Sequence, residues 1–192
     1  RQSNYQMRTL HAPFGEPSFA REFRTISRYE KFGIPALKAA FFGERKVDGE
    51  VRAILLTRAL DGWDDLDSLL QRWSDLSSAQ HSAILQACGQ LARRLHGARQ
   101  VHGCFYPKHI FLQATGDGYL AQLIDLEKTR PLLFGLRDRA KDLEPLLRRA
   151  PEWSEAQLRE LLAAYLDQSQ DSSLIDSWLA RLTARRTHKE TR

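Results

Sequence analysis

The chain has 192 residues, and 42% of them are hydrophobic, which is enough to bury the core of one domain or of a two-lobed one. No run of about 18 apolar residues occurs, and the first residues lack the apolar stretch of a signal peptide, which argues against a membrane span and favours the cytosol. The formal net charge of +5 indicates an acidic partner and leaves open nucleic acid, a phosphorylated sugar and an anionic membrane surface.

The first clear element is a helix between Pro17 and Gly33, because apolar residues recur at the spacing of three and four that one helix face requires. Glu22 falls on that face, between Phe19 and Phe23. A carboxylate without a partner is costly to remove from water. We therefore expect Glu22 either at the edge of the face or beside a cation.

Two strand-like segments come next, residues 39–42 and 51–56, with Asp48-Gly49 between them. Asp-Gly is favoured at the two positions of positive φ in a type I′ turn, so the segments predict an antiparallel hairpin. Asp61-Gly62 then interrupts the chain, and most of the sequence after it has the pattern of helices. We place the boundary between an N-terminal and a C-terminal part near Leu60.

The longest predicted helix spans residues 78–96 and carries a continuous apolar stripe. Cys88 lies in this stripe and is expected to be a core residue, and neither Cys88 nor Cys104 belongs to a zinc-ligand or disulfide pattern. A later helix begins at Ser154, because Gln157 completes a capping box. The residues expected to be buried in the two helices are Ile84, Leu85, Cys88, Leu91, Ala92 and Leu95, and Leu158, Leu161, Leu162, Tyr165 and Leu166.

The end of the chain, residues 181–192, contains five basic side chains and a single acidic one, Glu190. Two interpretations stay open for this basic tail. It is either solvated and frayed, or it attaches electrostatically to anionic lipid headgroups, where each basic side chain near the surface contributes on the order of 1 kcal/mol.

The segment after the long helix contains the candidate chemistry. It holds His102-Gly103-Cys104 and His109, then a glycine-rich turn at residues 116–118, then a strand-like run of apolar residues around Asp125. Protein kinases have the same order of parts: a helix, a histidine-containing catalytic loop, a short strand pair and a metal-binding aspartate.

In the kinase order, Cys104 stands where the loop carries its general base, and His109, five positions later, stands where it carries a metal-binding asparagine. Asp125 corresponds to the aspartate that binds Mg²⁺ beside the ATP phosphates. Glu22 corresponds to the helix glutamate that pairs with a phosphate-binding lysine, although no glycine-rich phosphate loop precedes it.

Four parts of the chain are together similar to one family of kinases: Ala20-Arg21-Glu22-Phe23 with Gly33-Ile34-Pro35, Tyr106-Pro107-Lys108-His109-Ile110-Phe111, Leu123-Ile124-Asp125-Leu126-Glu127-Lys128, and Arg139-Ala140-Lys141-Asp142-Leu143. On these segments the chain resembles the Kdo/WaaP lipopolysaccharide kinase family, which includes InaA-like proteins, over roughly residues 1–166.

The resemblance implies an α+β, protein-kinase-like two-lobed fold. A truncated N-terminal lobe would occupy residues 1–60, and a mainly helical C-terminal lobe with the catalytic loop and the basic tail would occupy residues 61–192. Such kinases use ATP and Mg²⁺ to phosphorylate a sugar hydroxyl of the lipopolysaccharide core. They are cytoplasmic and work at the inner membrane face, so peripheral contact with an anionic membrane is expected.

The resemblance also implies a catalytic group of Cys104, His102 and Asp125, in which His102 braces the loop. Asp125 and His109 would hold the metal, and Lys108 would attract a phosphorylated sugar. The anchor of the catalytic loop would be Asp142, from a helix below it.

For the nucleotide, the resemblance implies that Glu22 pairs with an ATP-binding lysine just upstream of Arg1. The adenine would be held by backbone groups at the end of the second hairpin strand, at Thr57, Arg58, Ala59 and Leu60.

Two departures from the kinase pattern leave alternatives open. A thiol at Cys104 is a weaker hydrogen-bond acceptor than a carboxylate, so the chain is either a slow kinase or a nucleotide-binding pseudokinase that acts through a protein partner, with Cys104 as packing. The imidazole of His109 suits transition metals better than Mg²⁺, and it can instead bridge Asp125 to a phosphate. A helical module that binds nucleic acid is the remaining alternative, and the family resemblance argues against nucleic acid.

Overall fold

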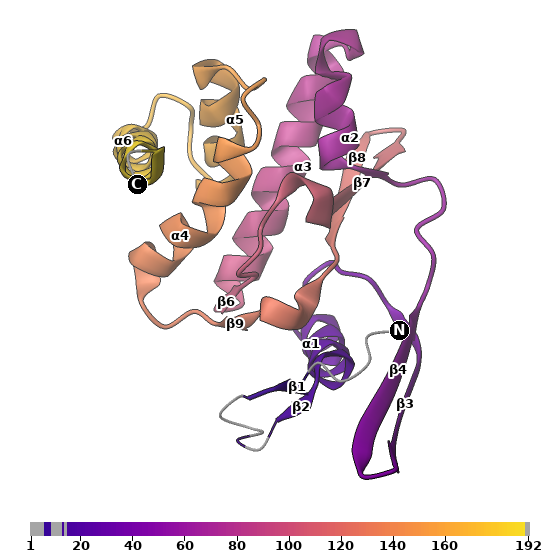
Figure 1. Ribbon diagram of the computed structural model, residues 1–192. Coiled ribbons are helices and arrows are strands. Elements are labelled where there is room, and N and C mark those ends of the chain that lie inside the picture. The colour runs from indigo at the N-terminus through magenta and orange to yellow at the C-terminus, as the bar shows by residue number, and fades with distance from the viewer. Residues whose placement is uncertain (1–5, 9–12, 14, 191–192) are drawn as a thin grey trace.

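The computed structural model describes residues 6–8, 13 and 15–190 (Figure 1). Arg1 to Tyr5, expected to come directly after the lysine-bearing strand, and Arg192 of the basic tail lie outside the described residues. The elements in chain order are β1 (Gln6–Met7), β2 (Glu16–Pro17), α1 (Ser18–Phe32), β3 (Ala39–Val47), β4 (Glu50–Thr57), β5 (Asp64–Asp65), α2 (Leu66–Gln71), α3 (Ser78–Gly97), β6 (Gln100–Val101), β7 (Ile110–Thr115), β8 (Gly118–Leu123), β9 (Arg130–Pro131), α4 (Gly135–Arg148), α5 (Glu155–Leu166) and α6 (Ser173–Glu190), with short 3₁₀ turns at Trp73–Asp75, Pro107–His109 and Leu126–Lys128.

The α1 helix and the β3–β4 hairpin form as the sequence predicts. Gly33 ends α1 in the left-handed conformation, with φ of 65°, which a glycine adopts without a steric penalty. Asp48 and Gly49 both have positive φ, as a type I′ turn requires, and join β3 to β4 in antiparallel register. Phe23 of α1 stacks on Phe42 of β3 with ring centroids 4.6 Å apart, which fixes the helix against the hairpin.

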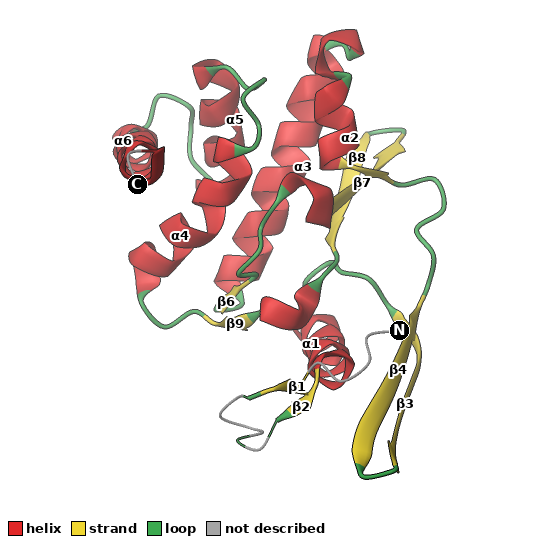
Figure 2. Ribbon diagram, viewed as in Figure 1, coloured by secondary structure: helices red, strands yellow, loops and turns green. Residues whose placement is uncertain are grey.

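Helix α3 is the centre of the helical part, which Figure 2 shows on the side of the molecule opposite the hairpin. The capping box of Ser77 and Gln80 starts it, and all six residues predicted for its stripe are buried. Cys88 is fully buried, which confirms the prediction of a core cysteine, and burial raises the pKa of its thiol to about 12. A side chain at Gly89 would place its Cβ 2.4 Å from the Leu161 carbonyl oxygen, so glycine is needed for α5 to pack this closely.

Helix α5 begins with the predicted capping box of Ser154 and Gln157. Three of its five predicted residues are buried, and Leu158 and Leu166 are half-buried at the rim of the core. The aromatic side chains of Tyr165 and Trp178 then join α5 to α6 edge to face.

The segment that follows α1 pairs with β8. The amide of Leu37, just after α1, donates to the Leu123 carbonyl at 2.9 Å, and the Leu123 amide donates to the Pro35 carbonyl at 3.1 Å. The chain leaving α1 therefore lies beside the strand that leads to Asp125.

The basic tail differs from the frayed interpretation, because α6 is helical as far as Glu190. Ile175, Trp178 and Leu182 bury one face of α6 in the core, and this packing supplies the stability that a short isolated helix lacks. None of the described helices is long and apolar enough to cross a bilayer.

The connection from β9 to α4 is held by Asp138, which gives a stability prediction. Its buried carboxylate accepts two hydrogen bonds from Arg130, at 2.7 and 2.9 Å, and one each from the amides of Leu133 and Phe134. The hydrogen bonds from Arg130 are the main cause that holds the pKa of Asp138 well below its ordinary value of 3.8. Asp138→Asn should therefore destabilise the protein at neutral pH by about 2 kcal/mol.

This contribution has a definite pH dependence. Because the folded-state pKa of Asp138 is depressed, its stabilisation is present above the unfolded value of 3.8 and is lost as pH falls through the folded value. Urea unfolding should show that the difference in the free energy of unfolding between wild type and Asp138→Asn is constant near neutral pH and becomes smaller in acid. A difference in the free energy of unfolding that is the same at pH 7 and in acid would contradict a stabilising role of the ionised Asp138.

Candidate active site

His102 braces the candidate catalytic loop from inside the protein. Its Nε2 donates to the Ile124 carbonyl at 2.9 Å, and its Nδ1 accepts from the Cys104 amide at 3.3 Å. The ring is fully buried, and burial lowers the pKa of His102. A neutral imidazole with one donor and one acceptor satisfies both contacts, so His102 ties residue 104 to the chain just before Asp125.

Asp142 anchors the same loop from α4, which confirms that prediction. Its two carboxylate oxygens accept from the amides of His102 and Gly103, each at 2.8 Å. His96 of α3 adds a contact from its Nε2 at 3.1 Å, and its Nδ1 lies 2.9 Å from the Tyr165 hydroxyl. Burial opposes ionisation of Asp142, but the contacts with His96 and His102 outweigh it and hold the pKa of Asp142 below its ordinary value.

His109 and Asp125 face each other across the end of the loop. Nδ1 of His109 donates to the Cys104 carbonyl at 2.9 Å, and Nε2 lies 3.2 Å from Oδ2 of Asp125. The carbonyl fixes the hydrogen on Nδ1, so a lone pair on Nε2 would point at a carboxylate oxygen. A cation bound by both atoms would relieve this contact.

Asp125 has a left-handed backbone, with φ of 57° and ψ of 61°. Aspartate and asparagine tolerate this conformation better than other residues with a side chain. The strand β8 ends at Leu123, so the carboxylate stands in the bend between the strand and the 3₁₀ turn and not on the strand itself.

Glu22 of α1 reaches the same place. Its carboxylate accepts a long hydrogen bond, 3.4 Å, from the Leu126 amide, and it is half-buried at the edge of the helix face. Burial is the main cause that raises the pKa of Glu22, and the negative charges of Asp125 and Glu127 raise it further. The negative charges of Asp125 and Glu127 therefore lie near enough to Glu22 to act on its carboxylate.

Lys128 is a neighbour of the loop that sequence reasoning missed. Its backbone passes so close to Gly103 that a Cβ there would lie 2.8 Å from the Lys128 carbonyl oxygen, and Gly103 has φ of 79°. The side chain lies beside the buried Cys104, and this interaction is the main cause that raises the pKa of Lys128. No periodicity links residues 103 and 128, so only the folded chain brings the ammonium of Lys128 beside Cys104.

The predicted adenine-binding segment is partly used by the protein itself. Thr57 ends β4, the Arg58 amide donates to the Lys38 carbonyl at 2.9 Å, and the Leu60 carbonyl accepts from the Trp63 amide at 3.1 Å. Ala59 lies between these two contacts.

The donor set fits a metal that brings further ligands with it. Among the described residues no group of three metal-ligating side chains occurs, and Asp125 with His109 offers one oxygen and one nitrogen. Mg²⁺ is usually held by one or two protein ligands together with phosphate oxygens and water, so the carboxylate fits it. The imidazole is the less usual ligand and would favour a transition metal.

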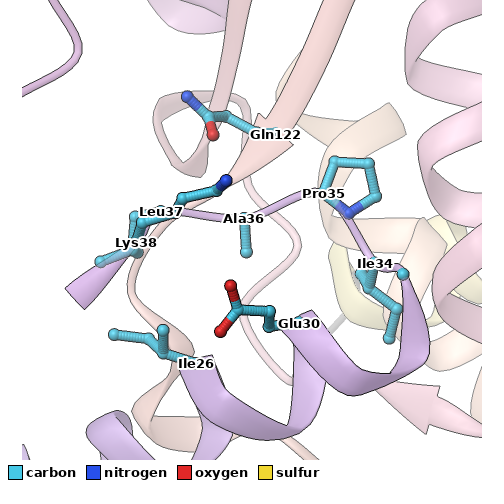
Figure 3. Close-up of a pocket in the computed structure, with 9 residues that line it drawn as sticks. Ile26, Glu30, Ile34, Pro35, Ala36, Leu37, Lys38 and Gln122 are labelled. Atoms are coloured by element: carbon cyan, nitrogen blue, oxygen red, sulfur yellow. The ribbon is translucent and has the colours of Figure 1, made fainter. Parts of the chain in front are cut away.

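A hollow of about 330 Å³ lies elsewhere, between α1 and residues 33–38 (Figure 3). Glu30 and Lys38 stand at its polar side, and Ile26 and Ile34 supply apolar walls. The site residues Glu22, His109 and Asp125 do not line it, so we do not assign it to the nucleotide.

A helix carboxylate, a histidine loop anchored from below and a carboxylate after a strand pair, in this chain order, define an α+β protein of the kinase-like class. The chain belongs to the lipopolysaccharide kinase (Kdo/WaaP) family, whose model matches residues 1–165. The predicted family and the α+β class are thereby confirmed.

Two relatives illustrate the likeness. The chain is 29% identical to Protein InaA of Escherichia coli (strain K12) over 155 residues, which cover 76% of this chain and 71% of InaA. Its fold is similar to that of a WaaP solved in complex with acyl carrier protein, with a TM-score of 0.73, 22% identity and coverage of 88% of this chain and 76% of WaaP.

Proposed function

We propose that the protein is an ATP-dependent phosphotransferase that acts on a sugar hydroxyl of a lipopolysaccharide core intermediate. Membership of the lipopolysaccharide kinase family supports the reaction class and the acceptor. The observation that carries the proposal is the convergence of Asp125, His109 and Glu22 beside the loop that Asp142 anchors.

In this proposal residues 1–60 and 61–192 are the two lobes, and the nucleotide lies between them. Asp125 and His109 would hold Mg²⁺, and Glu22 would hold the ATP-binding lysine. Of the predicted adenine-binding segment, Ala59 is the best backbone candidate, because Arg58 and Leu60 already use one group each within the protein.

The chain's own residues position the acceptor hydroxyl and stabilise the charge on the transferred phosphoryl group. Asp142 and His102 hold the loop backbone, so the acceptor hydroxyl meets a fixed surface. Lys128 supplies a positive charge beside Cys104, where it can bind an oxygen of the transferred phosphoryl group. Mg²⁺, when bound, neutralises charge on the phosphates.

Cys104 sets the expected rate. A general base contributes roughly 10²- to 10⁴-fold to a reaction rate, and a buried thiol is a poor substitute. Phosphoryl transfer draws mainly on positioning and electrostatics, so slow turnover remains without the base.

Restoring the base tests this interpretation. Cys104→Asp should raise ATP-dependent phosphorylation of a lipopolysaccharide core acceptor by roughly tenfold or more, because the new carboxylate can orient the hydroxyl and has Lys128 beside it. Cys104→Asn is the matched control, since it has the same shape without the charge and should give no increase. Equal rates in both variants would contradict a base at this position.

The second candidate is a nucleotide-binding pseudokinase that acts through a protein partner, and the thiol at residue 104 is the observation that favours it. Calorimetric ATP binding with no acceptor phosphorylation in wild type, Cys104→Asp or Cys104→Asn would decide for it. Acyl carrier protein is the first partner to test, because the structurally similar WaaP was solved in complex with it.

We also propose that the protein works at the cytoplasmic face of the inner membrane, where a core intermediate is reached from the cytosol. From the sequence alone, the basic residues of 181–192 are one candidate for this membrane contact, beside the interpretation of a solvated tail.

A further inference from the structure

The connection between β9 and α4, together with the first turn of α4, exposes an unusual run of apolar side chains. Leu133, Phe134 and Leu136 are 66%, 64% and 43% exposed, whereas the preceding Leu132 is 3% exposed and part of the interior. Figure 1 shows the chain between β9 and the start of α4 on the outline of the molecule. Three large apolar side chains within four residues are more than scattered surface residues explain.

The outward position of these side chains is built into the backbone. Asp138 accepts from the amides of Leu133 and Phe134 at 2.9 and 3.0 Å, and it also binds Arg130. The Leu132 amide donates to the Arg99 carbonyl at 2.7 Å. The connection is therefore fixed at both ends, and the side chains of residues 133–136 point outward from a stable frame.

Positive charge surrounds the apolar residues. Between Lys128 and Lys141 the chain has five basic residues and one acidic residue, and that acidic residue is the buried Asp138, already neutralised by Arg130. Arg137 and Lys141 are exposed, and neither forms an ion pair with a carboxylate among the described residues. An anionic surface would meet these charges without competition from nearby acids.

The shape of this surface favours a lipid bilayer over a protein as its binding partner. A partner helix is usually bound in a concave apolar groove, whereas here the apolar side chains stand on an outer connection that continues into the basic residues Arg137 and Lys141 of α4. Apolar groups that enter the headgroup region, together with basic groups that meet anionic headgroups, are the pattern of peripheral membrane attachment.

We propose that residues 133–136, which we term the apolar loop, insert into the surface of an anionic lipid bilayer, with Arg137 and Lys141 against the headgroups. This assigns membrane contact to the β9–α4 connection rather than to the basic tail, and it stands independently of phosphotransfer, because it requires no nucleotide.

Docking here would place the candidate active site close to the membrane. Arg130 of β9 pairs with Val101 of β6, and the next residues along the chain are His102 and Gly103 of the loop. The apolar loop is thus joined to the candidate catalytic loop through one strand pair, and an acceptor held in the bilayer would be presented near residue 104.

Vesicle flotation with the full chain tests the inference. Wild type should float with vesicles that contain phosphatidylglycerol and much less with vesicles of phosphatidylcholine alone. The double variant Leu133→Ser/Phe134→Ser should bind the anionic vesicles at least about tenfold more weakly, because two inserting side chains are lost. Leu120→Ser, which removes a similarly exposed leucine from β8, is the matched control and should bind as wild type.

Insertion itself can be seen by labelling. Both native cysteines are buried, so an environment-sensitive dye can be attached selectively to Leu136→Cys. Its emission should shift to the blue on anionic vesicles.

Three results would overturn the inference. If wild type bound no vesicles, the apolar loop would instead be interpreted as a surface that binds a protein partner. If the double variant floated as well as wild type, the apolar loop would not be part of the contact with the membrane. Loss of binding only when the basic residues of 181–190 are replaced by serine would return the contact to α6.

Discussion

Asp125→Asn should reduce phosphotransfer by about 10³-fold or more while leaving the protein folded. The side chain is the only carboxylate within reach of His109 Nε2 among the described residues, and it is the proposed metal ligand. Asparagine keeps the left-handed backbone that residue 125 adopts, whereas alanine would add strain there. Loss of the charge also removes repulsion on Glu22, so the melting temperature should not fall.

The measurement is acceptor phosphorylation together with the dependence of ATP binding on Mg²⁺, so that it also applies to a protein with little turnover. Asp117→Asn, at the exposed turn between β7 and β8, changes the same charge and is the matched control. If Asp125→Asn retained Mg²⁺-dependent ATP binding and wild-type turnover, the metal site would lie elsewhere.

Asp142→Ala should lower the free energy of unfolding by about 3 to 5 kcal/mol, the largest stability effect we expect from any single carboxylate. The change leaves the amides of His102 and Gly103 and the buried ring of His96 without their acceptor. Buried donors that lose a charged partner carry the full desolvation penalty.

Urea unfolding measures this effect, and two further variants keep it interpretable. Asp142→Asn retains the shape and part of the acceptor capacity, so it should fold and show a smaller loss. Asp176→Ala breaks the exposed ion pair between Asp176 of α6 and Arg159 of α5, so it should leave the free energy of unfolding nearly unchanged. An Asp142→Ala variant as stable as Asp176→Ala would show that the carboxylate is not the anchor of the loop.

Several elements could be predicted because their signals are local. Gly33 marks the end of α1, Asp48-Gly49 fixes the hairpin turn, and the capping box at Ser154 starts α5. Each of these signals acts through the backbone of a few neighbouring residues, so no distant part of the chain is needed to interpret it.

Elements without local signals were missed. The strands β1, β2, β6 and β9 have two residues each, too few to show an alternating pattern, and they exist because a partner strand is held beside them. The helical course of α6 through the basic tail was missed for a similar reason, since Trp178 and Leu182 stabilise it only by entering a core made by other helices.

The sequence by itself determined the family, because residue identity and spacing are properties of the chain, and it predicts the order of the candidate site residues and Cys104 at the position of a base. Only the tertiary structure decided that Glu22, Asp125 and His109 converge, that Lys128 lies beside Cys104 and that residues 133–136 face outward. Electrostatic and hydrogen-bond energies depend on distance and burial, and for residues about a hundred positions apart those quantities are set by folding alone.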